Sequence, residues 1–531
     1  MTALAFRAES GVVVHGDVRV NGIPADSSYM RRHSGFMHQE DMFIETMTAR
    51  MKLDGRIHSS DIRLRINRLL RDVGLIDRSD TRIGDGDNGK ILSGGEKKRL
   101  AFATELLTDP EILFLDEPTT GLDAHSASVL VSHMVSFALR NRTVLCTIHQ
   151  PSSTIFDSFH RIIFLAGGRV AFAGTSTQAI QFFSSQGYEC PCNYNPADFL
   201  MATLAIAPSG SDGSGKIAQK ICDAFLTSEA CNEIDVILQR EFDTACLQHH
   251  VKPRCWLRLY WLIYRGFLQV LRDPSVQLIR ILQKVSIATT AGLCFVGAVH
   301  LDQLGIQAVD GVIYLLVCEN AFFPMYATLA LIPQELPLLL REYKAGMYSV
   351  HLYYLARMIS LIPGLLMEPI LFTVIMYWLA GLRPAMDALS LTILVVIFTI
   401  NVSTACGCFF SAVYQSVPLA MAYLVPFDYI LMITMGPFIK LGSLPVYVQW
   451  IKYFSWLLHS TEALTIIQWK GVHNISCETT ELPCLTEGAE VLDRYDFNER
   501  NFWPNIIFMA VIYAVFHLLA YIFLWRRCKS K

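Results

Sequence analysis

The segment Leu92–Leu100, with the sequence LSGGEKKRL, contains residues that could bind a phosphate group. Ser93, Gly94 and Gly95 stand where a helix is expected to begin, and Glu96 follows in its first turn. The backbone N–H groups at a helix start are free, and the helix dipole favours an anion there. A Ser-Gly-Gly triplet by itself is more often an ordinary turn, so a phosphate site requires further residues of the right kind.

Two acidic residues and one histidine follow apolar segments that are typical of buried strands. Asp116 and Glu117 come directly after Ile112–Leu115, and His149 comes directly after Thr143–Ile148. An Asp at a strand end can hold Mg²⁺, and the next acid can orient and deprotonate an attacking water. The histidine is placed to contact a terminal phosphate. These residue types together predict the hydrolysis of a nucleoside triphosphate.

Two further polar residues fit the same chemistry. Gln39 lies in an earlier loop, Met37–Asp41, where its amide could contact Mg²⁺ and the γ-phosphate, and Asp123 ends the triplet Gly121–Asp123. Each signal is weak by itself, since a lone histidine or an acidic strand end is usually structural. Their order and spacing along the chain make the combination specific.

The elements that must hold these residues alternate between strand and helix. Apolar segments at 112–115, 143–148 and 161–165 have the length of buried strands, and residues 124–141 have the length of a helix. A strand–helix–strand succession predicts a largely parallel α/β sheet.

The second half of the chain differs in composition from the first. Of 531 residues, 52% are hydrophobic and only 17% are charged, and the mean hydropathy is +0.36. Beyond residue 275 the chain is mostly Leu, Ile, Val, Phe and Tyr, which predicts a cytosolic front half and a membrane-embedded back half. The net charge of −3, without clustered Lys and Arg, gives no reason to expect a nucleic-acid partner.

Six hydrophobic segments are long enough to cross the ~30 Å hydrocarbon core of a bilayer. They lie near residues 278–300, 311–333, 352–379, 387–413, 416–440 and 503–525. Residues 251–277 precede them as an expected amphipathic helix at the membrane surface. Flanking basic residues and the even number of spans predict that both termini are cytosolic. Residues 441–502 then form an extracellular or lumenal loop.

The predicted outward loop contains a candidate glycan site and a candidate disulfide. Asn474-Ile475-Ser476 is an N-glycosylation sequon, and Cys477 and Cys484 flank a short polar stretch. Disulfides persist on the oxidising side of a membrane. We therefore expect a Cys477–Cys484 bond and a glycan on Asn474.

The ordered set of motifs resembles the ATP-binding-cassette (ABC) ATPases. The matching elements are the Q-loop at Gln39, the signature Leu92–Glu96, the Walker B strand Ile112–Glu117, the D-loop Gly121–Asp123 and the switch histidine His149. The order of cassette before membrane domain is similar to the G subfamily of half-transporters, White-type members above all. Strings that extend this resemblance are Asn195–Phe199, Glu335–Pro337, Arg341–Tyr343 and Ser443–Tyr447.

The resemblance implies a fold, a partner and a substrate path. The fold is a cassette with a parallel-sheet core and a helical subdomain, followed by an all-α domain of six transmembrane helices. Two such half-transporters form a homodimer or heterodimer in the lipid bilayer. The dimer holds two ATP molecules with Mg²⁺ between the cassettes and moves a small-molecule substrate between the membrane halves.

The resemblance also implies roles for the motif residues of the cassette. Gln39 and Asp116 contact Mg²⁺, Glu117 is the general base, and His149 steadies the transferred phosphate. Ser93, Gly94 and Gly95 bind the ATP of the partner chain. Glu96 and Asp123 are further ATP-binding residues.

In the membrane half the resemblance is to the multidrug members. It places a substrate cavity at Asn320, Phe323, Tyr429 and Met432, with Asp428 as an acid that is unusual at its position. The segment Glu335–Tyr343 would couple the membrane domain to the cassette, with Arg341 and Glu342 as ion-pair partners. The four parts of the chain are then a cassette at 1–205, a linker at 206–250, a connecting helix at 251–277 and a membrane domain at 278–531.

One expected motif is missing from the sequence. No Walker A loop of the GxxGxGKT type precedes Met1–Arg7, and the match at Gly210–Lys216 is followed by Ile217, where Mg²⁺ binding needs Ser or Thr. The segment Thr48–Leu53 is also shorter than its counterpart in the family. Without the phosphate cradle, the chain alone is not expected to hydrolyse ATP. An incomplete sequence, truncated at its N-terminus, explains both gaps most simply, and a genuine short form is the alternative.

The predicted function is ATP-driven export of small amphipathic or aromatic molecules or lipids, across the plasma membrane or a vesicle membrane. The alternative is a catalytically silent subunit that regulates an intact partner. The retained Glu117 and His149 favour export, and the missing Walker A loop favours the silent subunit.

Overall fold

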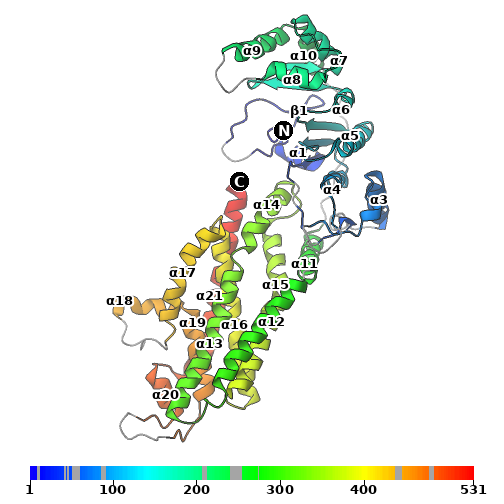
Figure 1. Ribbon diagram of the computed structural model, residues 1–531. Helices are drawn as coiled ribbons and strands as arrows, with labels where there is room; N and C mark the ends of the chain where they lie inside the picture. The colour runs from blue at the N-terminus through cyan, green and yellow to red at the C-terminus, as the bar shows by residue number, and fades with distance from the viewer. Residues whose placement is uncertain are drawn as a thin grey trace. The chain divides into compact units, whose positions relative to one another are not determined.

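The computed structural model describes residues 1–8, 12–40, 43–44, 47–50, 60–84, 91–205, 212–239, 254–272, 274–436, 445–476 and 484–530. The chain forms two units, Met1–Lys252 and Pro253–Lys531. Strands occur in the first unit and long helices dominate the second (Figure 1).

The core of the first unit is a parallel three-stranded sheet in the order β3-β4-β5, formed by Ser34–Met37, Ile112–Asp116 and Thr143–Thr147. The central strand β4 has the sequence ILFLD, and its four apolar residues are buried. Parallel sheets are covered on both faces, so their strands read as continuous apolar segments. The register places Asp116 opposite Thr147 at the carboxyl ends of two neighbouring strands. The prediction of a parallel α/β domain is confirmed.

Helices and short strands complete the first unit. The helices of this unit before β6 are α1 (Ser27–His33), α3 (Ser60–Asp72), α4 (Gly94–Leu106), α5 (Ala124–Ala138) and α6 (Ser153–Asp157), with the 3-10 turn η1 (Ile76–Arg78). Of these, α1, α4 and α5 pack on the sheet. Two antiparallel pairs are β1–β2 (Arg19–Val20 and Ile23–Pro24) and β6–β7 (Ile162–Ala166 and Arg169–Gly174). After them come α7 (Ser176–Ser185) and α8 (Pro196–Leu204).

The structure differs from the predicted linker at residues 206–250. It has two helices there, α9 (Asp212–Leu226) and α10 (Glu229–Gln239). Ala218, Ile221 and Phe225 are buried in a cluster that includes strand β7. Their spacing of three and four residues marks one face of a helix, which the Ser/Gly-rich stretch before it had concealed. Residues 206–211 and 240–250 lie outside the described part of the chain.

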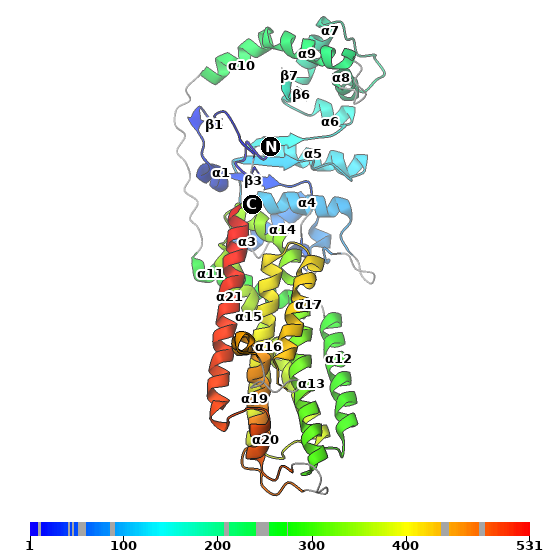
Figure 2. The same ribbon diagram turned by 90° about the vertical axis from the view of Figure 1, so that its left-hand side faces the viewer.

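The second unit is helical. It begins with α11 (Cys255–Leu271), α12 (Pro274–Phe295), α13 (Gln303–Ala327), α14 (Leu331–Lys344) and α15 (Val350–Ala380). The following elements are α16 (Met386–Val413), α17 (Val417–Ile433), α18 (Val446–Gln449), η3 (Trp450–Phe454), α19 (Trp456–Trp469), α20 (Gly488–Arg494), η4 (Glu499–Asn501) and α21 (Phe502–Ser530). Figure 2 shows the long helices running side by side as a bundle.

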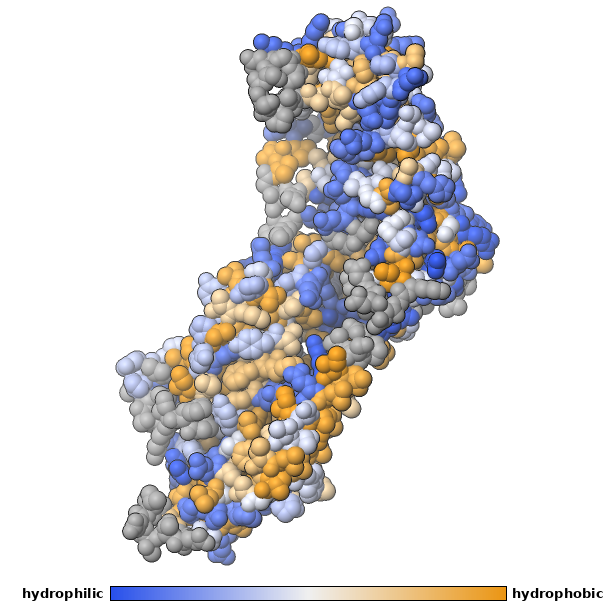
Figure 3. Space-filling model, viewed as in Figure 1, coloured by the Kyte–Doolittle hydropathy of each residue, from blue (hydrophilic) through white to orange (hydrophobic). Residues whose placement is uncertain are grey.

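Five helical segments of the described chain are long and apolar enough to cross a membrane. They are Gln277–Phe295, Gln303–Lys344, Val350–Ala380, Met386–Val413 and Glu499–Lys529, and the shorter apolar helix is α17. Hydrophobic side chains gather on the outer surface of this unit, over α12 among others (Figure 3). The predicted count of six spans stays a prediction.

Helix α16 is the most buried of these segments. It packs against α13 so closely that only glycine fits at residue 407. A Cβ atom on Gly407 would lie 2.0 Å from Thr328 Oγ1 and 2.4 Å from the carbonyl oxygen of Met325. Small residues allow close approach of membrane helices, so Gly407 fixes the distance between α13 and α16.

The predicted outward loop 441–502 contains a buried helix. Every residue of α19 is buried, and α19 packs on α13, α16 and α21. Its polar residues find partners, since Glu462 Oε1 accepts from Asn501 Nδ2 at 2.8 Å and His459 Nδ1 bonds with Asn505 Oδ1 at 2.8 Å. A helix of 14 residues spans ~21 Å, which is too short to cross a bilayer.

Candidate functional site

The carboxyl ends of the parallel strands bring two predicted catalytic residues into contact. Gln39 follows β3 and Glu117 follows β4, and Gln39 Nε2 donates to Glu117 Oε2 at 2.8 Å. Lys98 Nζ donates to the backbone carbonyl of Gln39 and ties this loop to helix α4. Gln39 is exposed and Glu117 is half-buried, so solvent reaches the pair.

Thr147, which the sequence analysis missed, positions both acids of the site. Its hydroxyl donates to Asp116 Oδ1 at 2.7 Å and accepts from the backbone N–H of Glu117 at 2.9 Å. Thr147 is the last residue of β5, opposite Asp116. The sequence signal that could have identified Thr147 is its place as a polar residue at the end of the strand next to the Walker B strand.

The backbone at Glu117 adopts a conformation that is uncommon for a non-glycine residue. Its φ is +44°, in the left-handed region. Such outliers cost free energy and cluster at functional sites. Thr120 Oγ1 donates to Glu117 Oε2 at 3.1 Å. The turn therefore aims the Glu117 carboxylate between the hydroxyl of Thr120 and the amide of Gln39.

His149 lies at the same edge of the sheet. Thr147 ends β5, so His149 follows two residues beyond the point where Asp116 and Thr147 pair. Its side chain is exposed. The structure thus gathers Gln39, Asp116, Glu117 and His149 at one edge, as the motif order predicted.

The signature residues form the start of helix α4. Ser93 is its N-cap, with Ser93 Oγ accepting from Glu96 N at 3.3 Å and Glu96 Oε2 accepting from Ser93 N at 2.8 Å. Glu96 also lies 3.6 Å from Arg78. Such a capping box fixes the first turn of a helix. Ser93 and Gly94 are exposed, so further N–H groups of this turn can accept an anion from outside.

Asp123 caps the neighbouring helix α5. Its Oδ2 accepts from the backbone N–H of Ser126 at 3.0 Å. Hydrogen bonds from the side chain and backbone of Ser126 hold the pKa of Asp123 below its ordinary value, so the carboxylate stays ionised. A Cβ on Gly95 would lie 3.2 Å from Ser126 Oγ, which links the starts of the two helices.

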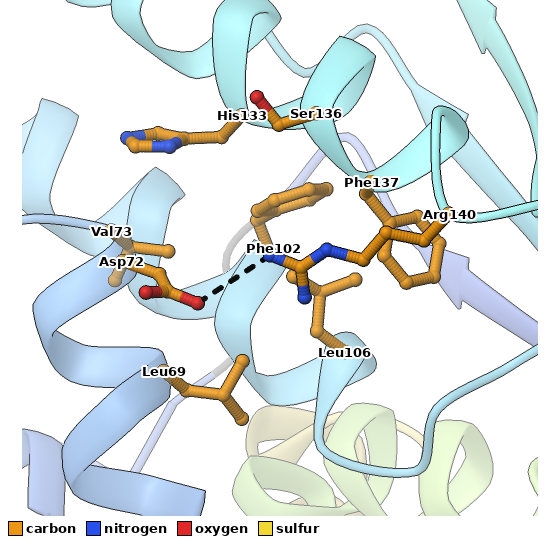
Figure 4. Close-up of a pocket in the computed structure, with 9 residues that line it drawn as sticks. All are labelled: Leu69, Asp72, Val73, Phe102, Leu106, His133, Ser136, Phe137 and Arg140. Carbon is orange, nitrogen blue, oxygen red and sulfur yellow. Dashed lines mark ion pairs between the residues drawn. The ribbon is translucent and has the colours of Figure 1, made fainter.

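A pocket of about 220 Å³ lies elsewhere in the first unit, between α3, α4 and α5. Figure 4 shows its lining, with Arg140 and Asp72 paired at 3.8 Å. His133 also lines it, and burial lowers the pKa of this imidazole. None of the predicted nucleotide-site residues lines this pocket.

The predicted coupling segment is the helix α14, and its acids are held inside the second unit. Glu342 Oε2 lies 2.8 Å from Arg265 Nη1 and accepts from the Tyr348 hydroxyl at 2.5 Å. Glu335 pairs with Arg357 at 2.8 Å. Glu342 is therefore an ion-pair partner of Arg265 on α11, and the expected ion-pair role of Arg341 stays a prediction.

The predicted substrate residues Asn320 and Phe323 face the interior of the helix bundle. Asn320 is fully buried, and its Nδ2 donates to the Leu316 carbonyl at 2.8 Å. The Phe323 ring centroid lies 4.6 Å from Lys284 Nζ, which in turn lies 2.8 Å from Glu319 Oε1. The sequence analysis did not connect Phe323 with this buried ion pair.

The other predicted substrate residues lie on α17. Asp428 is 7% exposed and Tyr429 is 59% exposed. The Tyr314 hydroxyl contacts Met432 Sδ at 3.7 Å. The five predicted residues are therefore distributed between the bundle interior and one helix surface.

The candidate disulfide is described on one side only. Cys484 is disulfide-bonded, and its predicted partner Cys477 lies outside the described residues. Asn474 has a φ of +65°. The backbone N–H of Ser476 donates to the Leu301 carbonyl at 2.8 Å, so the sequon is held next to the start of α13.

Comparison with protein families matches three regions. Residues 5–120 match the family described as ABC transporter, and residues 149–222 and 258–469 match families described as ABC-2 type transporter.

Whole-chain relatives agree with these matches. The chain is 46% identical to Protein scarlet of Drosophila melanogaster, over 100% of this chain and 82% of that protein. It is 33% identical to Protein white of the same organism, over 100% of this chain and 80% of that protein. It is 28% identical to ABC transporter G family member 14 of Arabidopsis thaliana, over 96% of this chain and 81% of that protein.

Proposed function

This chain belongs to the White-type half-transporters of the ABC transporter G subfamily, and we propose that Gln39, Asp116, Glu117 and His149 form the hydrolytic half of its ATP site. Members of this group are half-transporters that export small molecules through a multi-pass membrane domain. This chain is likewise a multi-pass half-transporter that exports small molecules. The observation that supports these residue roles is the hydrogen bond between Gln39 and Glu117 at the strand ends.

Each residue of this edge has a separate task. Bound Mg²⁺ neutralises charge on the phosphates of ATP, and Asp116 and Gln39 have the oxygen ligands it prefers. Glu117 accepts the proton of the attacking water, and Thr120 and Gln39 hold its carboxylate in place. Thr147 keeps Asp116 and Glu117 in register. His149 steadies the transferred phosphate.

The start of helix α4 serves the partner chain. Ser93, Gly94 and Gly95 bind the ATP that is held by the other cassette of the dimer, and Glu96 keeps Ser93 in the capping position. The charged Asp123 fixes the adjoining helix. The partner is a second half-transporter, either identical or different. An intact hydrolytic edge argues against a catalytically silent subunit.

The substitution Glu117→Gln tests the hydrolytic role. In membranes that contain the assembled transporter, it is expected to lower ATPase activity and export by at least ~100-fold while ATP binding persists. Glu111→Gln is the matched control, since Glu111 precedes the same strand at its other end. Retention of ATPase activity by the Glu117→Gln transporter would exclude Glu117 as the general base.

The orientation in the membrane is also a proposal. We place both termini in the cytosol and residues 441–502 outside it, in the plasma membrane or a vesicle membrane, with a Cys477–Cys484 bond and a glycan on Asn474. The bonded state of Cys484 supports an oxidising location. A glycosidase-sensitive gel shift that Asn474→Gln removes is the expected result, and a shift-free native protein would contradict the glycan.

The cargo is a small amphipathic or aromatic molecule or a lipid. The coupling of the cassette to the membrane domain runs through α14, which contains Glu335, Arg341 and Glu342. The proposed substrate residues are Asn320, Phe323, Asp428, Tyr429 and Met432, and Asp428 decides the chemical class of the cargo.

A further inference from the structure

Asp428 differs from three acids of the second unit that have basic partners. Glu319, Glu335 and Glu342 each lie 2.8 Å from a basic side chain. Asp428 is 7% exposed, and within the described residues no basic side chain pairs with its carboxylate, whose polar neighbour is the neutral hydroxyl of Tyr326. A buried charge without a partner of opposite charge is costly, and inside a membrane it marks function by default.

The position gives no packing reason for an acid. Asp428 continues the buried stripe of α17, which otherwise consists of Ala420, Leu424 and Leu431. An apolar side chain would serve this stripe better, because replacement of buried charges by apolar groups is often neutral or stabilising.

Two tyrosines lie near this carboxylate. The hydroxyl of Tyr326 on α13 interacts with Asp428 and with Tyr429, which follows Asp428 in the chain. Tyr326 is half-buried and Tyr429 is 59% exposed, so the phenol rings extend from the buried carboxylate to the surface of the chain. Aromatic rings attract ammonium groups through cation–π contact, and a carboxylate near them supplies the opposite charge.

The same unit contains a cation held in this way by the protein itself. Lys284 Nζ lies 2.8 Å from Glu319 Oε1, with the ring centroids of Phe323 and Phe372 at 4.6 and 5.5 Å. One carboxylate and two aromatic rings surround that ammonium. The set of Asp428, Tyr326 and Tyr429 has the same composition, but the described residues supply no cation to it.

We propose that Asp428, Tyr326 and Tyr429 bind the ammonium group of an amphipathic organic cation, which is the cargo class of this transporter. The inference rests on the proposed function and narrows it from small amphipathic or aromatic molecules to amines. The carboxylate supplies the charge, the rings supply cation–π contact, and the cationic group becomes the partner of opposite charge that the described residues do not give to Asp428.

The test uses three matched probes that differ only in the charged end. They are 2-phenylethylamine, which is a cation, 2-phenylethanol, which is neutral, and 3-phenylpropionate, which is an anion. Binding to the assembled transporter in phosphatidylglycerol nanodiscs is measured by calorimetry. The cation is expected to bind at least ~10-fold more tightly than the alcohol, and the anion most weakly.

Variants identify the residues responsible. Asp428→Asn is expected to remove the preference for the cation while binding of the alcohol stays within about twofold, since the amide keeps the shape. Tyr326→Leu weakens cation binding, and Tyr326→Phe retains most of it. Asp387→Asn is the control, because it removes the same charge from an exposed position at the start of α16. A cation preference that survives Asp428→Asn, or its absence from the native transporter, overturns the proposal.

Two sources of the ammonium group are separable. If phosphatidylethanolamine in the nanodisc competes with 2-phenylethylamine, a lipid headgroup shares the site, and if it does not, the site takes free amines; both results keep the ammonium class. The ATPase activity of the same samples is recorded in parallel. Normal ATPase activity without cation preference refutes the amine site alone, whereas an active Glu117→Gln transporter refutes the proposed function.

Discussion

Charged groups are held differently in the two units of this transporter. At the sheet edge of the first unit, Glu117 and Asp116 are half-buried and bond to the neutral groups of Gln39, Thr120 and Thr147. In the helix bundle of the second unit, Lys284, Arg265 and Arg357 each lie 2.8 Å from a buried or half-buried carboxylate.

The difference follows from what surrounds each group. A site that must receive Mg²⁺ and ATP keeps its acids free of basic partners, so that the incoming cation meets an unneutralised carboxylate. A charge inside a membrane has no water to solvate it, so it needs a partner from the chain. Asp428 lies in the second unit but, like the acids of the first unit, it has no basic partner among the described residues. We therefore expect a ligand to supply that partner.

The largest expected effect comes from breaking a pair in the bundle. Lys284→Met leaves Glu319 without its partner and is expected to lower the free energy of unfolding by about 3 kcal/mol. Thermal unfolding of the purified protein in detergent measures it. The double variant Lys284→Met, Glu319→Gln should recover most of the loss, and Lys470→Met, at an exposed position, should change little. Equal stability of the single and double variants would contradict a pairwise role.

The next effect concerns the spacing of the helices that hold these pairs. Gly407→Ala places a Cβ 2.4 Å from the Met325 carbonyl oxygen, which cannot move without shifting α13. We expect a loss of about 2 kcal/mol. Gly364→Ala is the matched control in another membrane helix, because its nearest neighbour would be Glu368 Oε1 at 3.9 Å. Similar melting temperatures for both variants would show that α13 and α16 tolerate separation.

A smaller effect is expected from loosening the neutral contacts of the first unit. Thr147→Val keeps the shape of the side chain but removes its bonds to Asp116 and Glu117. We expect ATPase activity to fall about 10-fold with ATP binding nearly unchanged, as for other residues that orient a metal ligand. Thr143→Val, at the opposite end of β5, should retain activity. Full ATPase activity in Thr147→Val would contradict a positioning role for Thr147 and would show that the turn at Glu117 is sufficient.

The smallest effect is a pH dependence in the first unit. Burial lowers the pKa of His133 from its ordinary value of 6.5, so between the two pKa values the unfolded chain binds more protons than the folded one. The free energy of unfolding should therefore decrease as pH falls through 6.5. His133→Gln should weaken this decrease and His125→Gln, at an exposed position, should not. Unfolding curves recorded from pH 8 to pH 5 compare the variants.

Sequence patterns predicted the structure correctly where all the residues that determine it lie within one segment. The apolar strand at 112–115 with its acidic end predicted both the parallel sheet and the place of Asp116 and Glu117. The capping position of Ser93 followed from its place before the helix of Glu96. Thr147 was missed because a threonine at a strand end is common, and its role exists only through the strand beside it.

Sequence patterns missed helices whose burial depends on distant parts of the chain. Residues 456–469 of the predicted outward loop form the buried helix α19, in which Glu462 and His459 bond to Asn501 and Asn505. The Ser/Gly start of α9 concealed a helix whose apolar face packs on β7. In both cases the burial depends on contacts that no local window contains.

The sequence by itself determined the chemistry of the cassette and the membrane nature of the second half, because motif order and hydropathy are properties of consecutive residues. Only the tertiary structure decided which charges pair. It joined Glu342 to Arg265 across 77 positions and Lys284 to Glu319 across 35, and it left Asp428 without a basic partner among the described residues. Electrostatic pairing acts through space over a few ångströms, so only the packing of helices determines it.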